Sequence, residues 1–113
     1  MKKFVLPAII LVATLALLAA CGRDSNLHGS WEWELDSTYV YTFNSNGTGT
    51  RGGAAFGIDN FRWSTPGNGV LRLNFTSGPM FNSAFPNRQD FTYSISGNTL
   101  TIVGEETWHY TRR

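Results

Sequence analysis

The chain of 113 residues contains a single cysteine, Cys21, so no disulfide can form within it. Its lysines, Lys2 and Lys3, both lie at the N-terminus, and its two histidines are His28 and His109. After Cys21 there are seven arginines and eight carboxylates, which leaves a net charge of about −1. Nucleic-acid binding normally needs an excess of basic surface. The composition therefore argues against a nucleic-acid partner.

The chain also lacks a recognisable catalytic set. No serine stands in a G-x-S-x-G motif, and the two histidines lie near opposite ends of the sequence. Glu32, Glu34 and Asp36 share one face of a predicted strand, where charges more often protect a sheet edge than bind a metal. We therefore expect no catalytic residue, no metal and no cofactor, and we interpret the protein as a non-enzyme.

The longest apolar run covers Phe4 to Ala20, directly after Met1-Lys2-Lys3, and it ends in small residues. A basic start, an apolar stretch and a small-residue cleavage site are typical of a secretory signal. The run is short of the roughly 20 residues that cross a bilayer, and Pro7 lies inside it. We predict that residues 1–20 form a helical signal peptide that is removed, and that no membrane span is retained.

The end of this run, Leu18-Ala19-Ala20-Cys21, resembles the bacterial lipobox. The resemblance implies that the Cys21 thiol receives a diacylglycerol, that cleavage precedes it, and that the new amine is acylated. Two or three acyl chains give lasting membrane attachment, whereas one chain binds weakly. The expected location is the bacterial cell envelope. With Gly22 in place of Asp after the cysteine, the resemblance implies the outer membrane facing the periplasm in a Gram-negative source, or the outer face of the cell membrane in a Gram-positive one.

The remaining chain divides into a short tether and one domain. We assign residues 21–27 to the lipidated cysteine and its tether, and residues 28–113 to the domain. The six residues from Gly22 to Leu27 span at most about 20 Å, so the domain should lie close to the bilayer.

Apolar residues alternate with polar ones nearly everywhere after His28, which is typical of strands with one buried face. The residues on the predicted inward faces are Trp31, Trp33, Leu35, Tyr39, Tyr41, Phe43, Phe61, Trp63, Leu71, Leu73, Phe75, Phe91, Tyr93, Ile95, Leu100, Ile102, Trp108 and Tyr110. Asn46-Gly47 and Gly97-Asn98 are hairpin signals, Pro66–Gly69 forms a longer turn, and we place the first hairpin turn at Asp36-Ser37. About eight short strands follow. A meander of this kind exposes two edges unless it closes, so we predict an all-β, small antiparallel up-and-down barrel.

A second resemblance concerns this domain. Gly29-Ser30-Trp31 is similar to the G-x-W signature of lipocalins, and the run from Tyr41 to Gly49 resembles the second hairpin of short bacterial lipocalin-like lipoprotein domains. The later aromatic-x-aromatic-Ser and Gly-Asn-x-Leu-x-Ile segments fit the same pattern. The resemblance implies a lipocalin-like barrel over residues 28–113.

The aromatic residues are the candidate binding feature. They can line a pocket for a small hydrophobic ligand or fill a closed core, since an eight-stranded barrel permits either; so many rings in so short a chain favour the filled core. Two segments with apolar residues, Gly52–Gly57 and Gly78–Asn87, break the alternation. We expect them to plug a barrel mouth, with gating a cavity or contacting lipid or a partner as alternatives. The candidate ligand-binding residues are Trp31, Trp33, Tyr41, Phe43, Trp63, Phe81, Phe85, Tyr93 and Trp108.

Two functional interpretations follow. In the first, a membrane-anchored lipoprotein binds a small hydrophobic ligand through one barrel mouth. In the second, a structural or protein-interaction lipoprotein, including an enzyme inhibitor, contacts an envelope protein through its outer surface and apolar loops.

Overall fold

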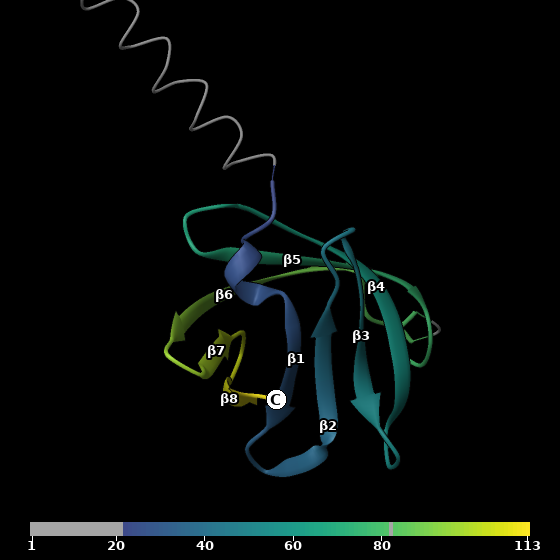
Figure 1. Ribbon diagram of the computed structural model, residues 1–113. Coiled ribbons are helices and arrows are strands. Elements are labelled where there is room, and N and C mark those ends of the chain that lie inside the picture. The colour runs from purple at the N-terminus through teal and green to yellow at the C-terminus, as the bar shows by residue number, and fades with distance from the viewer. Residues whose placement is uncertain (1–21, 82) are drawn as a thin grey trace, which may run out of the picture.

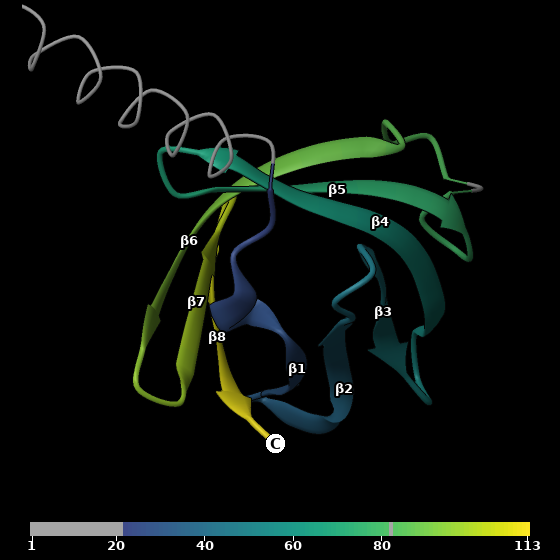
Figure 2. The same ribbon diagram turned by 45° about the horizontal axis from the view of Figure 1, so that its top comes forward.

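The computed structural model describes residues 22–81 and 83–113, so the predicted signal peptide and Cys21 lie outside the described residues. Eight antiparallel strands follow one another around a closed barrel (Figures 1 and 2). The predicted all-β, up-and-down barrel is therefore confirmed. Within the described ranges, no helix is both long enough and apolar enough to cross a membrane.

Each strand pairs with its sequence neighbours, and β1 also pairs with β8, which closes the sheet. Closure removes the free edges that a meander would expose. The elements are a 3₁₀ turn η1 (Ser25–Leu27) and the strands β1 (Gly29–Trp33), β2 (Asp36–Phe43), β3 (Thr48–Gly53), β4 (Gly57–Gly67), β5 (Val70–Ser77), β6 (Arg88–Ser96), β7 (Thr99–Val103) and β8 (Thr107–Arg112).

The antiparallel order places the connections at the two ends of the barrel. The N-terminal end carries η1 and the β2–β3, β4–β5 and β6–β7 turns. The opposite end carries the β1–β2, β3–β4 and β7–β8 turns and the longer β5–β6 loop. We call it the open end, because a cavity lies there. In Figure 1 the N-terminal end is at the top and the β1–β2 turn is at the bottom.

The predicted hairpin turns are confirmed at Gly47, where φ is +89°, and at Gly97, where φ is +58°. The first hairpin prediction is wrong. Its turn residues are Glu34 and Leu35, and Asp36 already belongs to β2, where its carboxylate accepts hydrogen bonds from the Thr38 N–H and hydroxyl. A bulge beside Trp33 shifts the register, so Trp33 pairs with Asp36. Leu35 consequently lies at the tip of the turn and is 68% exposed.

All the other residues predicted to face inward are buried or packed against the core. Trp31, Phe43 and Trp63 are among the largest fully buried side chains, and the rings of Phe43 and Trp63 lie 5.2 Å apart. Leu27 of η1 is fully buried beneath them, and the Trp31 indole N–H donates a hydrogen bond of 2.9 Å to the Leu27 carbonyl. This end of the barrel is therefore filled.

The segment expected to be a tether is instead part of the domain. The Arg23 guanidinium donates to the Trp63 carbonyl at 3.1 Å, and the Asp24 N–H donates to the Thr65 hydroxyl at 2.8 Å. The Tyr93 hydroxyl donates to the Asp24 carboxylate at 2.7 Å. With these contacts and buried Leu27, the folded domain begins by residue 23 rather than at residue 28.

Candidate ligand-binding cavity

The structure separates the nine residues predicted to bind a ligand into three groups. Trp31, Phe43 and Trp63 fill the closed N-terminal end, and Tyr93 packs there with its hydroxyl bound to Asp24. Trp33, Tyr41 and Trp108 instead line a cavity at the open end. Phe81 and Phe85 lie in the β5–β6 loop, 42% and 66% exposed.

The expectation that the apolar loops plug the mouth is wrong for Phe81 and Phe85, because both side chains are largely exposed. Phe56 is 54% exposed as well, but its ring lies 5.4 Å from that of Tyr39 and lines the cavity. Among the described residues of the β5–β6 loop, Met80 alone packs against the core. The filled-core and pocket interpretations consequently apply to opposite ends of one barrel.

The cavity has a volume of about 260 Å³. It is larger than the engineered cavity of about 150 Å³ that binds benzene, and it is slightly below the roughly 300 Å³ at which drug-sized pockets begin. It therefore fits one small ligand. Its lining consists of Trp33, Tyr39, Tyr41, Arg51, Phe56, Phe91, Ile102, Trp108 and Tyr110.

Edge-to-face contacts between rings hold this lining in place. The Trp33 ring lies 5.3 Å from that of Trp108 and 5.7 Å from that of Tyr39, and the rings of Tyr41 and Tyr110 are 5.1 Å apart. Aromatic pairs in this geometry contribute about 0.5–1.5 kcal/mol beyond their burial. The rings are thus positioned in advance of any ligand.

Among the described residues, Arg51 is the one charged member of the cavity lining, and sequence reasoning missed it. It lies on β3 and is only 9% exposed. Its Nε donates to Asp59 Oδ2 at 3.2 Å, its Nη1 donates to the Tyr41 hydroxyl at 2.8 Å, and its guanidinium lies 4.5 Å from the Phe75 ring centre. A buried charge needs such partners because desolvation costs several kcal/mol.

A signal for this ion pair does exist in the sequence. Arg51 has the same alternation phase as Gly49, and Asp59 has the same phase as inward-facing Phe61 and Trp63. Arg51 and Asp59 then become direct cross-strand partners between β3 and β4. Two opposite charges on inward-facing positions of neighbouring strands predict a buried pair, provided that the register is known.

The protonation states at the cavity follow from burial and neighbouring groups. Burial raises the pKa of Tyr39 to about 12, and burial also raises the pKa of Tyr110 above its ordinary value. Both phenols therefore keep their protons at neutral pH. Burial alone would lower the pKa of Arg51, but neighbouring Tyr41 and Tyr39, with the hydrogen bonds to Tyr41 and Asp59, raise it. The guanidinium therefore stays charged.

Trp33 supplies a further unusual feature. Its indole Nε1 is buried and has no hydrogen-bond partner among the described residues. Buried polar groups in native proteins are nearly always paired, and an unpaired one costs about 1–3 kcal/mol. The orphan donor shows that the described residues around Trp33 supply no acceptor for it.

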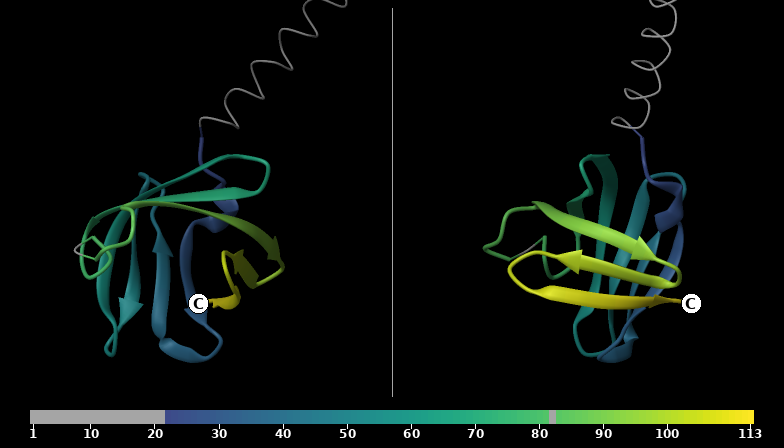
Figure 3. Two further views of the ribbon diagram at one scale, coloured as in Figure 1. Left: turned by 180° about the vertical axis from the view of Figure 1, so that it is seen from behind. Right: turned by 90° about the vertical axis from the view of Figure 1, so that its left-hand side faces the viewer.

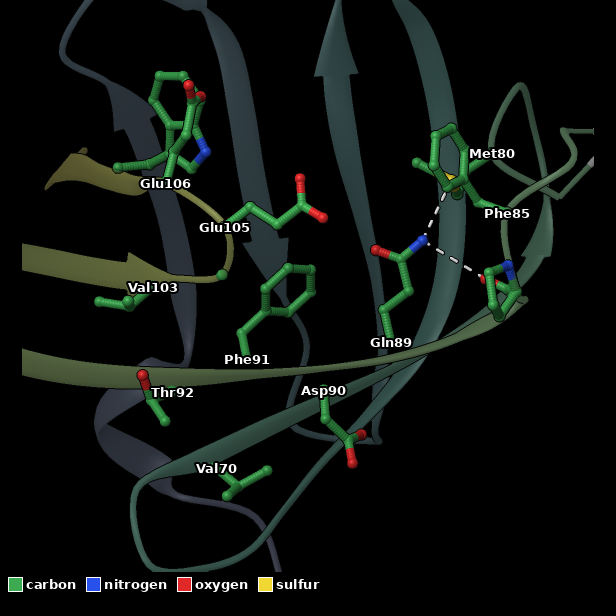
Figure 4. A pocket seen from close by; sticks show the side chains of 13 residues that line it. Val70, Met80, Phe85, Gln89, Asp90, Phe91, Thr92, Val103, Glu105 and Glu106 are labelled. Carbon is green, nitrogen blue, oxygen red and sulfur yellow. Dashed lines mark hydrogen bonds between the residues drawn. The ribbon is translucent and has the colours of Figure 1, made fainter.

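A wider groove of about 990 Å³ lies beside the cavity and shares its Phe91 and Trp108 walls (Figure 4). It exists because β6 pairs with β7 only from Thr92 onward, so residues 88–91 pair with β5 alone. Figure 3 shows β6 diverging from β7 and β8 toward the β5–β6 loop. The loop is fastened over the groove by Gln89, whose amide donates to Met80 Sδ and to the Pro86 carbonyl, both at 3.4 Å.

Large exposed apolar side chains gather at the open end. They occupy the β1–β2 and β3–β4 turns, the β5–β6 loop and the strand ends beside the β3–β4 and β7–β8 turns. We call this set the apolar rim. Its members are Leu35, Phe56, Ile58, Phe81, Phe85 and Val103.

Residues 22–81 and 83–113 contain no group of three or more His, Cys, Asp or Glu side chains that could hold a metal ion. No family model, curated protein or solved structure matches the chain.

Proposed function

We propose that this protein is a non-catalytic envelope lipoprotein, anchored through acyl chains on Cys21, whose lipocalin-like barrel binds one small and largely apolar ligand. The observation that carries the proposal is the aromatic cavity of about 260 Å³ at the open end. The rest of the interior is filled by large side chains. The rings hold one another in place, so a ligand would lose little free energy to their ordering.

The N-terminal contacts support a defined orientation on the membrane. Arg23 is bound to the barrel, so Gly22 alone separates it from Cys21. Two residue steps span at most about 7 Å. An anchor at Cys21 would hold the N-terminal end of the barrel against the bilayer. The cavity would then open on the side facing away, where a water-borne ligand can reach it.

Ligand binding is tested by tryptophan fluorescence of the full-length processed protein in lipid nanodiscs, with a panel of single-ring aromatic and short aliphatic compounds. Trp33 and Trp108 line the cavity, so a bound ligand should change their emission. Ile102→Phe should abolish the response by filling the cavity. Thr99→Phe, on the exposed face of the same strand, is the matched control and should leave it intact. A panel that leaves the wild-type emission unchanged contradicts the proposal.

The apolar rim favours a second candidate function, which is contact with an envelope protein, including inhibition of an envelope enzyme. Exposed apolar patches usually mark contact sites, and these residues surround the end that faces away from the proposed anchor. Replacement of Phe81 and Phe85 by Ser should remove crosslinked partners from a pull-down, whereas Thr99→Ala should not. An unchanged set of partners would exclude these two side chains from the interface.

A further inference from the structure

The polar side chains that line the cavity carry more hydrogen-bond donors than acceptors. Nine of the described residues line it, and they include one guanidinium, three phenol hydroxyls and two indole N–H groups, but no carboxylate or amide side chain. Asp59, which pairs with Arg51, is not part of the lining. The lining therefore offers hydrogen-bond donors in an apolar surround, and its side-chain acceptors are the phenol oxygens alone.

Several N–H groups of Arg51 are not used in hydrogen bonds within the described residues. A guanidinium carries five N–H groups, and the described residues accept from Nε and once from Nη1. The other N–H groups, including both on Nη2, have no acceptor among residues 22–81 and 83–113. The Arg51 side chain is 11% accessible. The orphan indole N–H of Trp33 indicates independently that the lining lacks an acceptor.

We propose that the cavity binds a small carboxylate, whose carboxyl group accepts hydrogen bonds from Arg51 and whose apolar body packs among the rings. This inference rests on the proposed ligand-binding function and gives the ligand a chemical class. Arginine binds carboxylates through parallel hydrogen bonds that are about twice as strong as neutral ones. The affinity for a carboxylate should therefore be much higher than the affinity for a neutral head group of the same shape.

The ion pair between Arg51 and Asp59 does not remove the preference for a carboxylate over a neutral head group. Asp59 is held from two sides, because its Oδ2 accepts from Arg51 Nε and its Oδ1 accepts from the Met80 N–H at 2.7 Å. The unclaimed Nη groups can still meet a ligand. The phenols of Tyr39 and Tyr110 are neutral and do not repel an anion. Glu105 and Glu106 line the neighbouring groove rather than the cavity. In about 0.1 M salt, exposed charges are largely screened beyond about 10 Å.

The cavity volume limits the ligand to one ring with a short arm. We therefore choose 3-phenylpropanoate as the probe and 3-phenylpropanamide, which has nearly the same shape and no charge, as its match. A hydrogen bond to a charged group contributes about 1.5–3 kcal/mol, and each 1.4 kcal/mol is a tenfold change in affinity. The carboxylate should bind at least tenfold more tightly than the amide.

The experiment measures both dissociation constants by titration calorimetry on full-length protein in phosphatidylcholine nanodiscs. Arg51→Gln should bind the two probes within about twofold of each other. Arg62→Gln is the matched control, because it makes the same change on the exposed face of β4 and outside the cavity lining. It should keep the tenfold preference.

Each outcome decides a different point. Equal binding of both probes to the wild type overturns the carboxylate inference and leaves ligand binding intact. An Arg51→Gln variant that keeps the tenfold preference, or an equal loss of the preference in Arg62→Gln, also overturns it. Absence of binding by either probe or by the wider panel contradicts the proposed function itself. If Arg51→Gln does not fold, the wild-type comparison of the two probes decides.

Discussion

Replacement of Leu27 by Ala tests whether the segment before β1 belongs to the folded domain. Leu27 is fully buried in η1 and closes the N-terminal end of the barrel. The sequence places it in a flexible tether, where truncation would cost nothing. The two interpretations therefore predict very different stabilities for the same variant.

The magnitude follows from burial. Leu→Ala in a packed core costs about 2–5 kcal/mol, through the lost transfer free energy and the cavity left behind. The hydrogen bond from the Trp31 indole to the Leu27 carbonyl involves the backbone and should survive, so we expect about 3 kcal/mol within this range. Each kcal/mol shifts the midpoint of a domain of this size by about 4–8 °C. Leu27→Ala should therefore lower Tm by about 12–24 °C.

The assay is thermal and urea unfolding of the full-length protein, followed by tryptophan fluorescence. Ser25→Ala is the control, because Ser25 lies in the same 3₁₀ turn and is exposed. It should change the free energy of unfolding by less than about 0.5 kcal/mol. If Leu27→Ala is as stable as this control, the segment is a tether and the assigned packing is wrong.

Three further predictions concern the anchor, the buried phenols and a crowded glycine. Cys21→Ser should abolish acylation and leave an uncut precursor by mass spectrometry; normal processing would contradict the lipobox interpretation. Folding raises the pKa of Tyr39 from 10.0 to about 12, so its contribution to stability is complete below pH 10 and is lost as pH rises toward 12. In urea unfolding, Tyr39→Phe should lose less stability than the wild type over this pH range. An equal loss of stability would argue against burial of the Tyr39 phenol. Gly49→Ala should cost about 1–3 kcal/mol in the same assay, because a methyl group there meets the Phe61 ring and the Thr42 carbonyl oxygen; an unaffected midpoint would refute that crowding.

The sequence predicts the cavity only in part. Trp33, Tyr41 and Trp108 could be named because strict alternation marks inward-facing aromatic residues. Alternation does not show which of these residues face a cavity and which fill the core. Phe81 and Phe85 were expected to plug a mouth, but they lie in a loop without periodicity, so no pattern indicates the direction of their side chains.

The two hairpin outcomes have a similar explanation. Gly97-Asn98 was predictable because glycine tolerates the positive φ that a tight turn needs. The first turn was misplaced because the bulge beside Trp33 shifts the register, and a bulge depends on the partner strand. Leu35 then occupies the tip of the turn, where no local signal places a leucine.

By itself, the sequence determined that this chain has eight antiparallel strands with one apolar face, because period-two alternation and turn chemistry are local properties. Tertiary structure alone decided that Leu27 seals one end of the barrel and that Arg51 and Asp59 meet inside it. These features depend on register and on contacts between residues far apart in the chain. The cavity has the same origin, since it is the space that the rings of several strands leave between them.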